Sequence, residues 1–389
     1  MRIVMVQVGD YKEAYERLRD GGGETYGNQK RSVEAVGELV STQREVIVIC
    51  ARAQPYDTML DNGVRAIGHN EHAPNGQAKL LNLVQSLKPT HLVVRGPRTE
   101  IISYGIKAGI EVLPIFADSF NRKSFRQHLR TRKLVKLLNN AKIRTVSNHN
   151  INASRSLCAL GVDDSKVVPY DYDRGYSPDQ YEPKTGPTNQ TTISMVYVGV
   201  ISEPKGTFDV LDAIPILDSM GIRTELTVIG DHQGALDSAI KKLGLADRVH
   251  LKGKLPNAQV LEEMRLHDAV IVPSQHRYPE GLPHTIFESL ATRTPLIASD
   301  HPMFTPVLND GETCVMFEAG NAQSIADATQ RLLNTRGLYL RISSNTQIAW
   351  EKLCVPLNWE EVVTHWLANT PESQKELDRG SVQAILAHK

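Results

Sequence analysis

Short apolar segments alternate with longer amphipathic segments along most of this chain, and this alternation restricts the fold more than any other feature of the sequence. The apolar runs of the first half predict buried strands over residues 2–8, 45–50, 91–94, 112–116 and 143–147. The amphipathic patterns between them predict helices over residues 28–39, 78–87 and 101–108. Strands that alternate with helices indicate βαβ units and a mostly parallel sheet.

A polar stretch interrupts this alternation. Residues 177–192, SPDQYEPKTGPTNQTT, contain three prolines and no apolar period, which is typical of a linker. After it the pattern resumes, with strands expected over residues 193–198, 225–229, 249–251, 269–272 and 295–298 and helices over 207–217 and 235–243. We therefore predict an α/β protein with two Rossmann-like, doubly wound domains that face a central cleft, over residues 1–176 and 193–358.

Composition narrows the class of protein. Lys and Arg together number 44, as do Asp and Glu, and this zero net charge argues against a general nucleic-acid binder. The cysteines are too widely spaced to suggest a disulfide framework or a zinc site; they are Cys50, Cys158, Cys314 and Cys354. No segment approaches the roughly 20 apolar residues of a membrane span, and residues 1–8 resemble a first strand more than a signal peptide. We expect a cytoplasmic protein, with any membrane contact peripheral.

The most informative stretch runs from Tyr278 to Pro295, after the strand that ends near Val272. We expect a helix with Pro283 in its first turn, where the missing N–H costs little. The N–H groups at about His284 and Thr285 would then point into the crevice and could bind a phosphate.

Two carboxylates belong to this stretch, Glu280 before the helix and Glu288 inside it. They fit three interpretations: two solvated glutamates, the acid pair of a glycoside hydrolase, or two separate contacts to a sugar and a ribose with a diphosphate between them. Eight helical residues rise about 12 Å, whereas hydrolase pairs lie about 5–9.5 Å apart. The hydrolase interpretation is therefore disfavoured.

Two glycine-containing stretches follow strands. Lys205, in Gly199–Gly206, precedes an expected helix and could neutralise a diphosphate, or it could be an ordinary loop lysine; the spacing is not that of a P-loop. Gly22 and Gly23 would allow close backbone approach to a ligand, or form a flexible surface loop. The G-x-G-x-x-G pattern fails because Tyr26 stands at its last position.

The segment 122–136 is strongly basic and is expected to be helical. It is either a solvated helix face or a contact for an anionic acceptor or an anionic membrane surface. None of the 13 histidines has the spacing H-E-x-x-H, and G-x-S-x-G is absent, so neither a metalloenzyme nor a serine hydrolase is indicated.

Taken together, these stretches resemble the retaining glycosyltransferases of family 4, which have the GT-B fold. Glu280–Glu288 looks like the E-x7-E motif of that family, and residues 199–206 look like its G-x-x-x-x-E-K-G segment with Glu203 and Pro204 exchanged. The remaining matches, in the expected order along nearly the whole chain, are Gly22-Gly23, residues 168–173, residues 228–231 and residues 249–253. Residues 359–389 resemble the C-terminal helix that returns to the N-terminal domain.

The resemblance implies roles for particular residues. Glu280 would hold the hydroxyls of the donor sugar, Glu288 would hold the ribose, and Lys205 would contact the diphosphate. The complete donor site implied is Gly22, Gly23, Gly199, Lys205, Gly230, Leu251, Glu280, Gly281, Leu282, Pro283, His284, Thr285 and Glu288. The reaction implied is transfer of a hexose, with retention, from a nucleotide sugar to a hydroxyl group, in carbohydrate biosynthesis. UDP is favoured as the nucleotide and GDP is next, and no metal or other cofactor is expected.

Two positions depart from the family pattern. Val200 stands where the family usually has an arginine, and residues 117–121 lack a histidine that is common there. Asp118 is our candidate for an acceptor-side role, with Glu280 and Lys205 as the other catalytic candidates. The acceptor could be a glycan, a lipid-linked sugar or a small molecule. The departures leave two alternatives open, a GT-B sugar-nucleotide epimerase or hydrolase and a non-catalytic sugar-nucleotide-binding protein.

Overall fold

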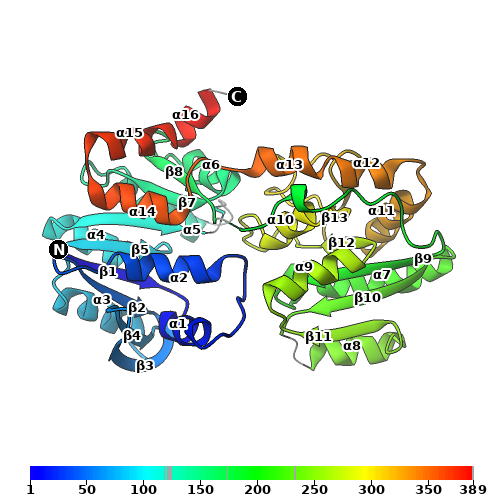
Figure 1. Ribbon diagram of the computed structural model, residues 1–389, viewed down its shortest axis with the longest axis horizontal. Coiled ribbons are helices and arrows are strands. Elements are labelled where there is room, and N and C mark those ends of the chain that lie inside the picture. Colours follow the sequence, from blue (N-terminus) through cyan, green and yellow to red (C-terminus); the bar gives the residue numbers. More distant parts are fainter. Residues whose placement is uncertain (118, 121–124, 173, 232–233, 388–389) are drawn as a thin grey trace. The chain divides into compact units, whose positions relative to one another are not determined.

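A computed structural model describes residues 1–117, 119–120, 125–172, 174–231 and 234–387, without the side chains of residues 125–130. The chain divides into two compact units (Figure 1). The first unit comprises Met1–Glu24, Asn28–Asp173 and Val355–Lys389, and the second comprises Thr25–Gly27 and Arg174–Cys354. The main divisions thus lie at 173/174 and 354/355, whereas the sequence pattern placed domain boundaries at 176/177 and 358/359.

A mostly parallel sheet forms the centre of the first unit, with the strand order β3-β4-β2-β1-β5-β6-β7-β8 (Figure 1). Its strands are β1 (Arg2–Gln7), β2 (Glu45–Cys50), β3 (Arg52–Met59), β4 (Arg65–Asn70), β5 (His91–Arg95), β6 (Glu111–Phe116), β7 (Val146–His149) and β8 (Val167–Tyr170). The β3–β4 pair is antiparallel. Central strands such as β1 and β2 are runs of Val and Ile because helices cover both faces of the sheet.

Helices bury two apolar clusters against this sheet. The helices of this unit are α1 (Tyr11–Arg19), α2 (Gln29–Glu38), α3 (Gly76–Ser86), α4 (Thr99–Ala108), α5 (Phe125–Leu138), α6 (Ile151–Ala159), α14 (Trp359–Ala368), α15 (Pro371–Arg379) and α16 (Val382–Ala387).

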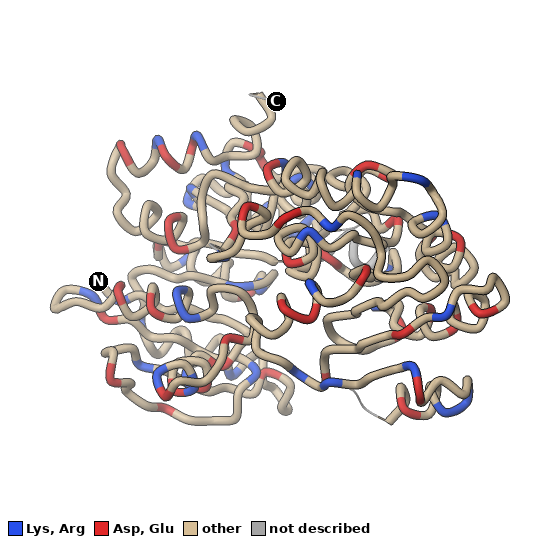
Figure 2. Tube along the Cα trace, turned by 45° about the vertical axis from the view of Figure 1, so that its right-hand side comes forward, with Lys and Arg blue, Asp and Glu red and all other residues tan. Residues whose placement is uncertain are grey.

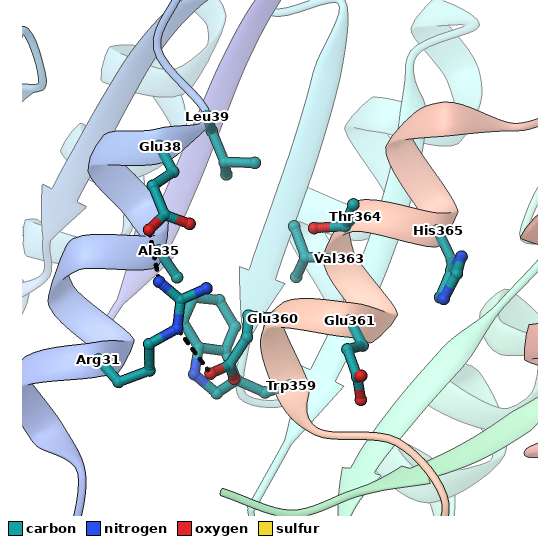
Figure 3. A pocket seen from close by; sticks show the side chains of 10 residues that line it. All are labelled: Arg31, Ala35, Glu38, Leu39, Trp359, Glu360, Glu361, Val363, Thr364 and His365. Atoms are coloured by element: carbon teal, nitrogen blue, oxygen red, sulfur yellow. Dashed lines mark hydrogen bonds and ion pairs between the residues drawn. The ribbon is translucent and has the colours of Figure 1, made fainter. Parts of the chain in front are cut away.

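The C-terminal residues complete the core of the first unit. Trp366 of α14 is fully buried in the cluster that also contains Ile3 and Val48. Figure 3 shows α14 beside α2, where the Arg31 side chain lies 2.5 Å from a carboxylate oxygen of Glu38. A small cavity of about 160 Å³ lies between these two helices.

The second unit has a parallel sheet in the order β11-β10-β9-β12-β13-β14 (Figure 1). Its strands are β9 (Thr192–Val198), β10 (Arg223–Ile229), β11 (Val249–Gly253), β12 (Ala269–Val272), β13 (Leu296–Ser299) and β14 (Val315–Phe317). In chain order within the unit this is 3-2-1-4-5-6, the order of doubly wound nucleotide-binding sheets, with the reversal between β9 and β12.

Helices cover both faces of this sheet as well, and they enclose two apolar clusters. The helices of this unit are α7 (Thr207–Ser219), α8 (Ala235–Leu243), α9 (Asn257–Leu266), α10 (His284–Ala291), α11 (Ala322–Asn334), α12 (Leu338–Ser344) and α13 (Thr346–Leu353), with short 3₁₀ turns η1 (Pro178–Gln180) and η2 (Glu203–Lys205). The predicted fold class, α/β with two Rossmann-like domains, is confirmed.

The predicted linker is anchored to the second unit. The Lys184 N–H donates to Ser343 Oγ at 2.7 Å, and the Thr188 N–H donates to Asp268 Oδ1 at 2.8 Å. Thr192, the last residue of the predicted linker, is the first residue of β9.

Two glycines bring the loops after β9 and β10 into backbone contact. Gly199 has a φ of 148° and Gly230 has a φ of 154°, values that side chains rarely permit. A Cβ atom on Gly230 would lie 2.1 Å from the Gly199 carbonyl oxygen. The close approach of the two loops therefore requires a glycine at position 230, and the backbone conformation favours a glycine at position 199.

The charge distribution agrees with the balanced composition. Acidic and basic residues are interspersed along the trace in Figure 2. Within the described part of the chain, no helix is both long enough and apolar enough to cross a membrane.

Candidate active site

A cavity of about 580 Å³ lies at the carboxyl ends of β9 and β10 in the second unit. Its lining comes from the loops that follow β9, β10 and β11, from helices α9 and α10, and from Thr25 and Tyr26. The lining residues are Thr25, Tyr26, Val198, Gly199, Val200, Ile229, Gly230, Asp231, Lys254, Leu255, Asn257, Val260, His284, Thr285 and Glu288. Open α/β sheets bind ligands at this edge, near the reversal of strand order.

Glu288 forms the buried carboxylate of the cavity. Its side chain belongs to α10 and is 4% exposed, and Asn257 Nδ2 donates a hydrogen bond of 2.6 Å to its Oε1. Burial raises the pKa of Glu288 to about 7, although the Asn257 amide and the positive charge of Arg174 both oppose the shift. A carboxyl group with this pKa can accept or donate hydrogen bonds near neutral pH, which suits recognition of hydroxyl groups.

Helix α10 begins at the cavity wall. Pro283 is its N-cap, with φ −66° and ψ 143°, so the expectation that Pro283 lies inside the first turn was wrong by one position. Proline has no polar side-chain atom, so Pro283 gives the backbone N–H groups of the first turn no side-chain hydrogen bond. Thr285 Oγ1 donates to the Val198 carbonyl oxygen at 3.1 Å, which fixes the start of α10 against the end of β9. Such a helix N-terminus can hold an anion.

Lys205 and Glu280 form an ion pair in a cluster adjoining this cavity. The Lys205 side chain is 13% exposed and the Glu280 side chain 7%. The Lys205 ammonium also lies 4.6 Å from the centre of the Tyr278 ring, and Ser274 Oγ donates to Glu280 Oε1 at 2.6 Å. The cluster thus holds one positive and one negative group that are largely withdrawn from water.

Tyr197 connects this cluster to the cavity. Its hydroxyl donates to the carbonyl oxygen of Val200, a lining residue, at 2.6 Å. Burial raises the pKa of Tyr197 above its ordinary range, and the nearby Glu280 and Tyr278 act in the same direction. The Tyr197 hydroxyl therefore stays protonated and holds the loop after β9 in place.

The structure brings some of the predicted donor residues together at the cavity: Gly199, Gly230, His284, Thr285 and Glu288. Gly281 is buried in the segment before α10, and Leu282 is 3% exposed in the apolar core, so neither lines the cavity. Leu251 also packs against the core and not into the cavity, and Leu255 lines it instead.

The other predicted site residues lie elsewhere. Gly22 and Gly23 belong to the first unit, where a Cβ atom on Gly22 would meet Arg17 Cγ at 2.5 Å. The small size of Gly22 is thus explained by the turn that ends α1, and a contact of this glycine pair with the donor stays a prediction. Asp118 lies outside the described residues, as do residues 122–124 of the basic segment.

Sequence reasoning missed the contributions of Asn257 and Tyr26. Asn257 is the first residue of α9, directly after the loop that follows β11, and this place at the carboxyl edge of the sheet was the available signal. Tyr26 stacks on His284 with 5.7 Å between ring centres. Its signal was its place in a glycine-containing stretch. Among the described residues, no group of three or more His, Cys, Asp or Glu side chains could hold a metal ion.

The sequence of the second unit matches a family model, glycosyl transferases group 1, over residues 180–348. This stretch contains the cavity walls built by β9 to α10 and the Lys205–Glu280 pair. Residues 180–348 form a glycosyl transferases group 1 domain.

Curated relatives agree with this assignment. This chain is 29% identical over 153 residues to alpha-D-kanosaminyltransferase of Streptomyces kanamyceticus, a match that covers 39% of each protein. It is also 29% identical over 143 residues to phosphatidyl-myo-inositol mannosyltransferase of Mycobacterium leprae, covering 36% of this chain and 37% of that protein. The matches therefore span about two fifths of the length of these relatives.

A solved structure has the same fold over the whole chain. Sucrose-phosphate synthase of Thermosynechococcus elongatus superposes with a TM-score of 0.66 at 14% identity, covering 100% of both chains. HepE of Anabaena, solved in complex with UDP and glucose, superposes with a TM-score of 0.62 at 15% identity, covering 96% of this chain and 100% of that one. The fold is that of the GT-B glycosyltransferases.

Proposed function

We propose that this chain is a retaining glycosyltransferase that moves a hexose from a nucleotide-sugar donor to a hydroxyl group of an acceptor. The observation that carries the proposal is the composition of the cavity in the glycosyl transferases group 1 domain. There, the buried carboxyl group of Glu288 accepts a hydrogen bond from the amide of Asn257. Glu288 lies on α10, and the N-terminus of the same helix opens at the cavity. A ribose diphosphate needs the same combination, a partner for its hydroxyls and a partner for its anion.

Three sets of residues would bind the ribose, the diphosphate and the sugar of the donor. Glu288 and Asn257 would bind the ribose hydroxyls, because both can exchange hydrogen bonds with a diol. The N-terminus of α10 at His284 and Thr285 would bind the diphosphate. Glu280, held by Ser274 and Lys205, would accept hydrogen bonds from the hydroxyls of the donor sugar.

Lys205 would act in the chemical step. As the bond between the sugar and the diphosphate breaks, negative charge grows on the diphosphate while the sugar becomes oxocarbenium-like. A lysine held in a largely dehydrated position stabilises that charge more effectively than one in water. The acceptor hydroxyl would attack from the face that the diphosphate leaves and pass its proton to the departing phosphate oxygen, so that the anomeric configuration is retained. No metal is required in this scheme.

The proposed donor is a UDP-sugar, with a GDP-sugar as the second choice. The fold match to HepE, whose structure contains UDP and glucose, supports UDP. The acceptor would be a glycan, a lipid-linked sugar or a small molecule. We further propose a cytoplasmic location, in which the basic segment 122–136 would contact the membrane peripherally if the acceptor is lipid-linked.

Turnover of donors against a panel of acceptors tests this proposal. UDP- and GDP-hexoses are incubated with the protein and with sugar, lipid-linked and small-molecule acceptors, and the anomeric configuration of any product is read by NMR. We expect a product of retained configuration, and a loss of rate of at least about 100-fold in Lys205→Ala and in Glu280→Ala.

The controls separate the alternatives. The variant His250→Asn changes an exposed residue on β11 and should keep the wild-type rate. Formation of free sugar or an epimer from donor alone would favour a hydrolase or an epimerase. Full activity in both Lys205→Ala and Glu280→Ala would overturn the site assignment.

A further inference from the structure

The cavity offers little positive charge for a diphosphate. Among its described lining residues, the side chains that can be cationic are Lys254 and His284. Lys254 already pairs with the carboxylate of Asp231, and both side chains are 71% exposed at the edge of the cavity. Val200 also lines the cavity and is 61% exposed, although it is apolar. An exposed valine at this place contributes neither charge nor a side-chain hydrogen bond.

His284 is placed where an anion would be held. It is the first residue of α10, and it lines the cavity together with Thr285 of the same helical turn. Its ring stacks on the Tyr26 ring with an angle of 27° between the planes, and this contact restricts the orientation of the imidazole. The two rings together form one wall of the cavity.

We propose that His284 is a donor-binding residue that contacts the diphosphate through its imidazole side chain, and that it provides there the side-chain contact that Val200 does not. The inference rests on the proposed function, because it assumes a nucleoside diphosphate in this cavity. It goes beyond the binding of an anion by backbone N–H groups, because it assigns selectivity for charge to one side chain. Tyr26 is then a positioning residue, which holds the imidazole but does not itself bind the diphosphate.

The side chain has two ways to contribute. A neutral imidazole can donate one hydrogen bond to a phosphate oxygen, and a protonated imidazole adds charge. Hydrogen bonds to charged groups are typically worth about 1.5–3 kcal/mol. Loss of one such bond therefore weakens binding by about 10-fold or more.

The test compares charged and uncharged probes. Dissociation constants for inorganic pyrophosphate, UDP and uridine are measured by calorimetry for wild type, His284→Ala and Tyr26→Ala. We expect His284→Ala to weaken the binding of pyrophosphate and UDP by about 10-fold and to leave the binding of uridine unchanged, because alanine has no hydrogen-bond donor. Tyr26→Ala removes the stacked ring and should weaken the binding of pyrophosphate and UDP to a smaller extent.

A rescue and a matched control complete the experiment. Val200→Arg in the His284→Ala background introduces a cation at the exposed position and should restore most of the lost affinity for pyrophosphate. His250→Ala makes the same substitution at an exposed site on the same unit and should change nothing. Circular dichroism and melting temperatures establish that each variant is folded, and His284→Phe, which keeps a ring but has no donor, is a second variant should His284→Ala unfold.

The outcomes distinguish the two proposals. If wild type binds pyrophosphate or UDP and His284→Ala or His284→Phe binds them equally well, the role of His284 is refuted and the proposed function stands. Equal weakening of uridine and of the charged probes would also refute it, because a general distortion of the cavity would then explain the loss. If wild type binds none of the probes, nor GDP, both proposals fail.

Discussion

Glu288 links the chemistry of the cavity to the stability of the protein. Its pKa is about 7 in the folded chain because burial penalises the carboxylate, against an ordinary value of 4.5. Between these two values the folded state keeps a proton that the unfolded state releases, so the stability of the folded state falls as pH rises. The loss is complete above about pH 7, and it amounts at most to about 3 kcal/mol.

The variant Glu288→Gln should remove this dependence. A glutamine oxygen can still accept the hydrogen bond from Asn257, and the side chain carries no charge to desolvate. We expect the difference in melting temperature, variant minus wild type, to be larger at pH 8 than at pH 5. Glu262→Gln, which changes an exposed glutamate of α9, should show the pH dependence of wild type. If the difference in melting temperature between Glu288→Gln and wild type is the same at both pH values, Glu288 does not hold a proton in the folded state as proposed.

Single residues of the site were predictable where a motif fixed their place along the chain. Glu280, Glu288 and Lys205 were singled out by the resemblance to family motifs, and the structure places Glu288 at the cavity and pairs the other two. Asn257 could not be found in this way, because its contact with Glu288 joins residues 31 positions apart. A pairing of this kind depends on how α9 and α10 pack, and no local pattern encodes it.

The junction between η2 and α7 shows how one element constrains another. Gly206 has a φ of 75°, and a Cβ atom there would lie 2.0 Å from the carbonyl oxygen of Pro273 after β12. Two separate constraints therefore require a glycine at position 206: the positive φ of its own backbone and the close contact with Pro273. Because Lys205 precedes it directly, the close contact also fixes where the Lys205 ammonium can reach.

Gly206→Ala and Gly244→Ala separate these two requirements. Gly244 ends α8 with a φ of 68°, and a Cβ atom there would meet nothing within 4 Å. We expect Gly244→Ala to cost about 1–2 kcal/mol of unfolding free energy from the backbone alone, and Gly206→Ala to cost several kcal/mol because the chain must also move away from Pro273. The measurement is denaturant unfolding of both variants. Equal costs would show that the contact with Pro273 is relieved easily.

The strands and helices with a clear apolar period were predictable, but several elements were not, and three of them show the reasons. Strand β3 contains Pro55, which removes a backbone donor, and such a strand is tolerated here because β3 lies at the edge of the sheet. Strand β7 was expected over residues 143–147 and runs instead over Val146–His149, so this expectation was wrong. Its last residues, Asn148 and His149, are polar but buried, and Ile143 is buried outside the strand. Helix α1 was not predicted, although its buried residues Tyr11, Ala14 and Leu18 follow helical spacing.

At the scale of the whole molecule, two Rossmann-like units share one chain, and the C-terminal residues return to the first unit. Val355–Lys389 belongs to the same unit as Met1–Glu24, so the first unit cannot be completed until the end of the chain is available. The general architecture was predictable from two rounds of alternating strands and helices. The return of the last helices was indicated only by the family resemblance, because no periodicity tells a helix which core it will cover.

The central claim is that the cavity of the second unit holds the nucleoside diphosphate of a sugar donor. The most direct measurement is the thermal stability of wild type and of Glu288→Ala with UDP, GDP and ADP. We predict that one nucleotide stabilises wild type, by about 2.7 kcal/mol at a concentration 100 times its Kd, and that Glu288→Ala loses most of this effect while remaining folded. If no nucleotide stabilises wild type, or if the same nucleotide stabilises Glu288→Ala equally, the cavity is not the donor site.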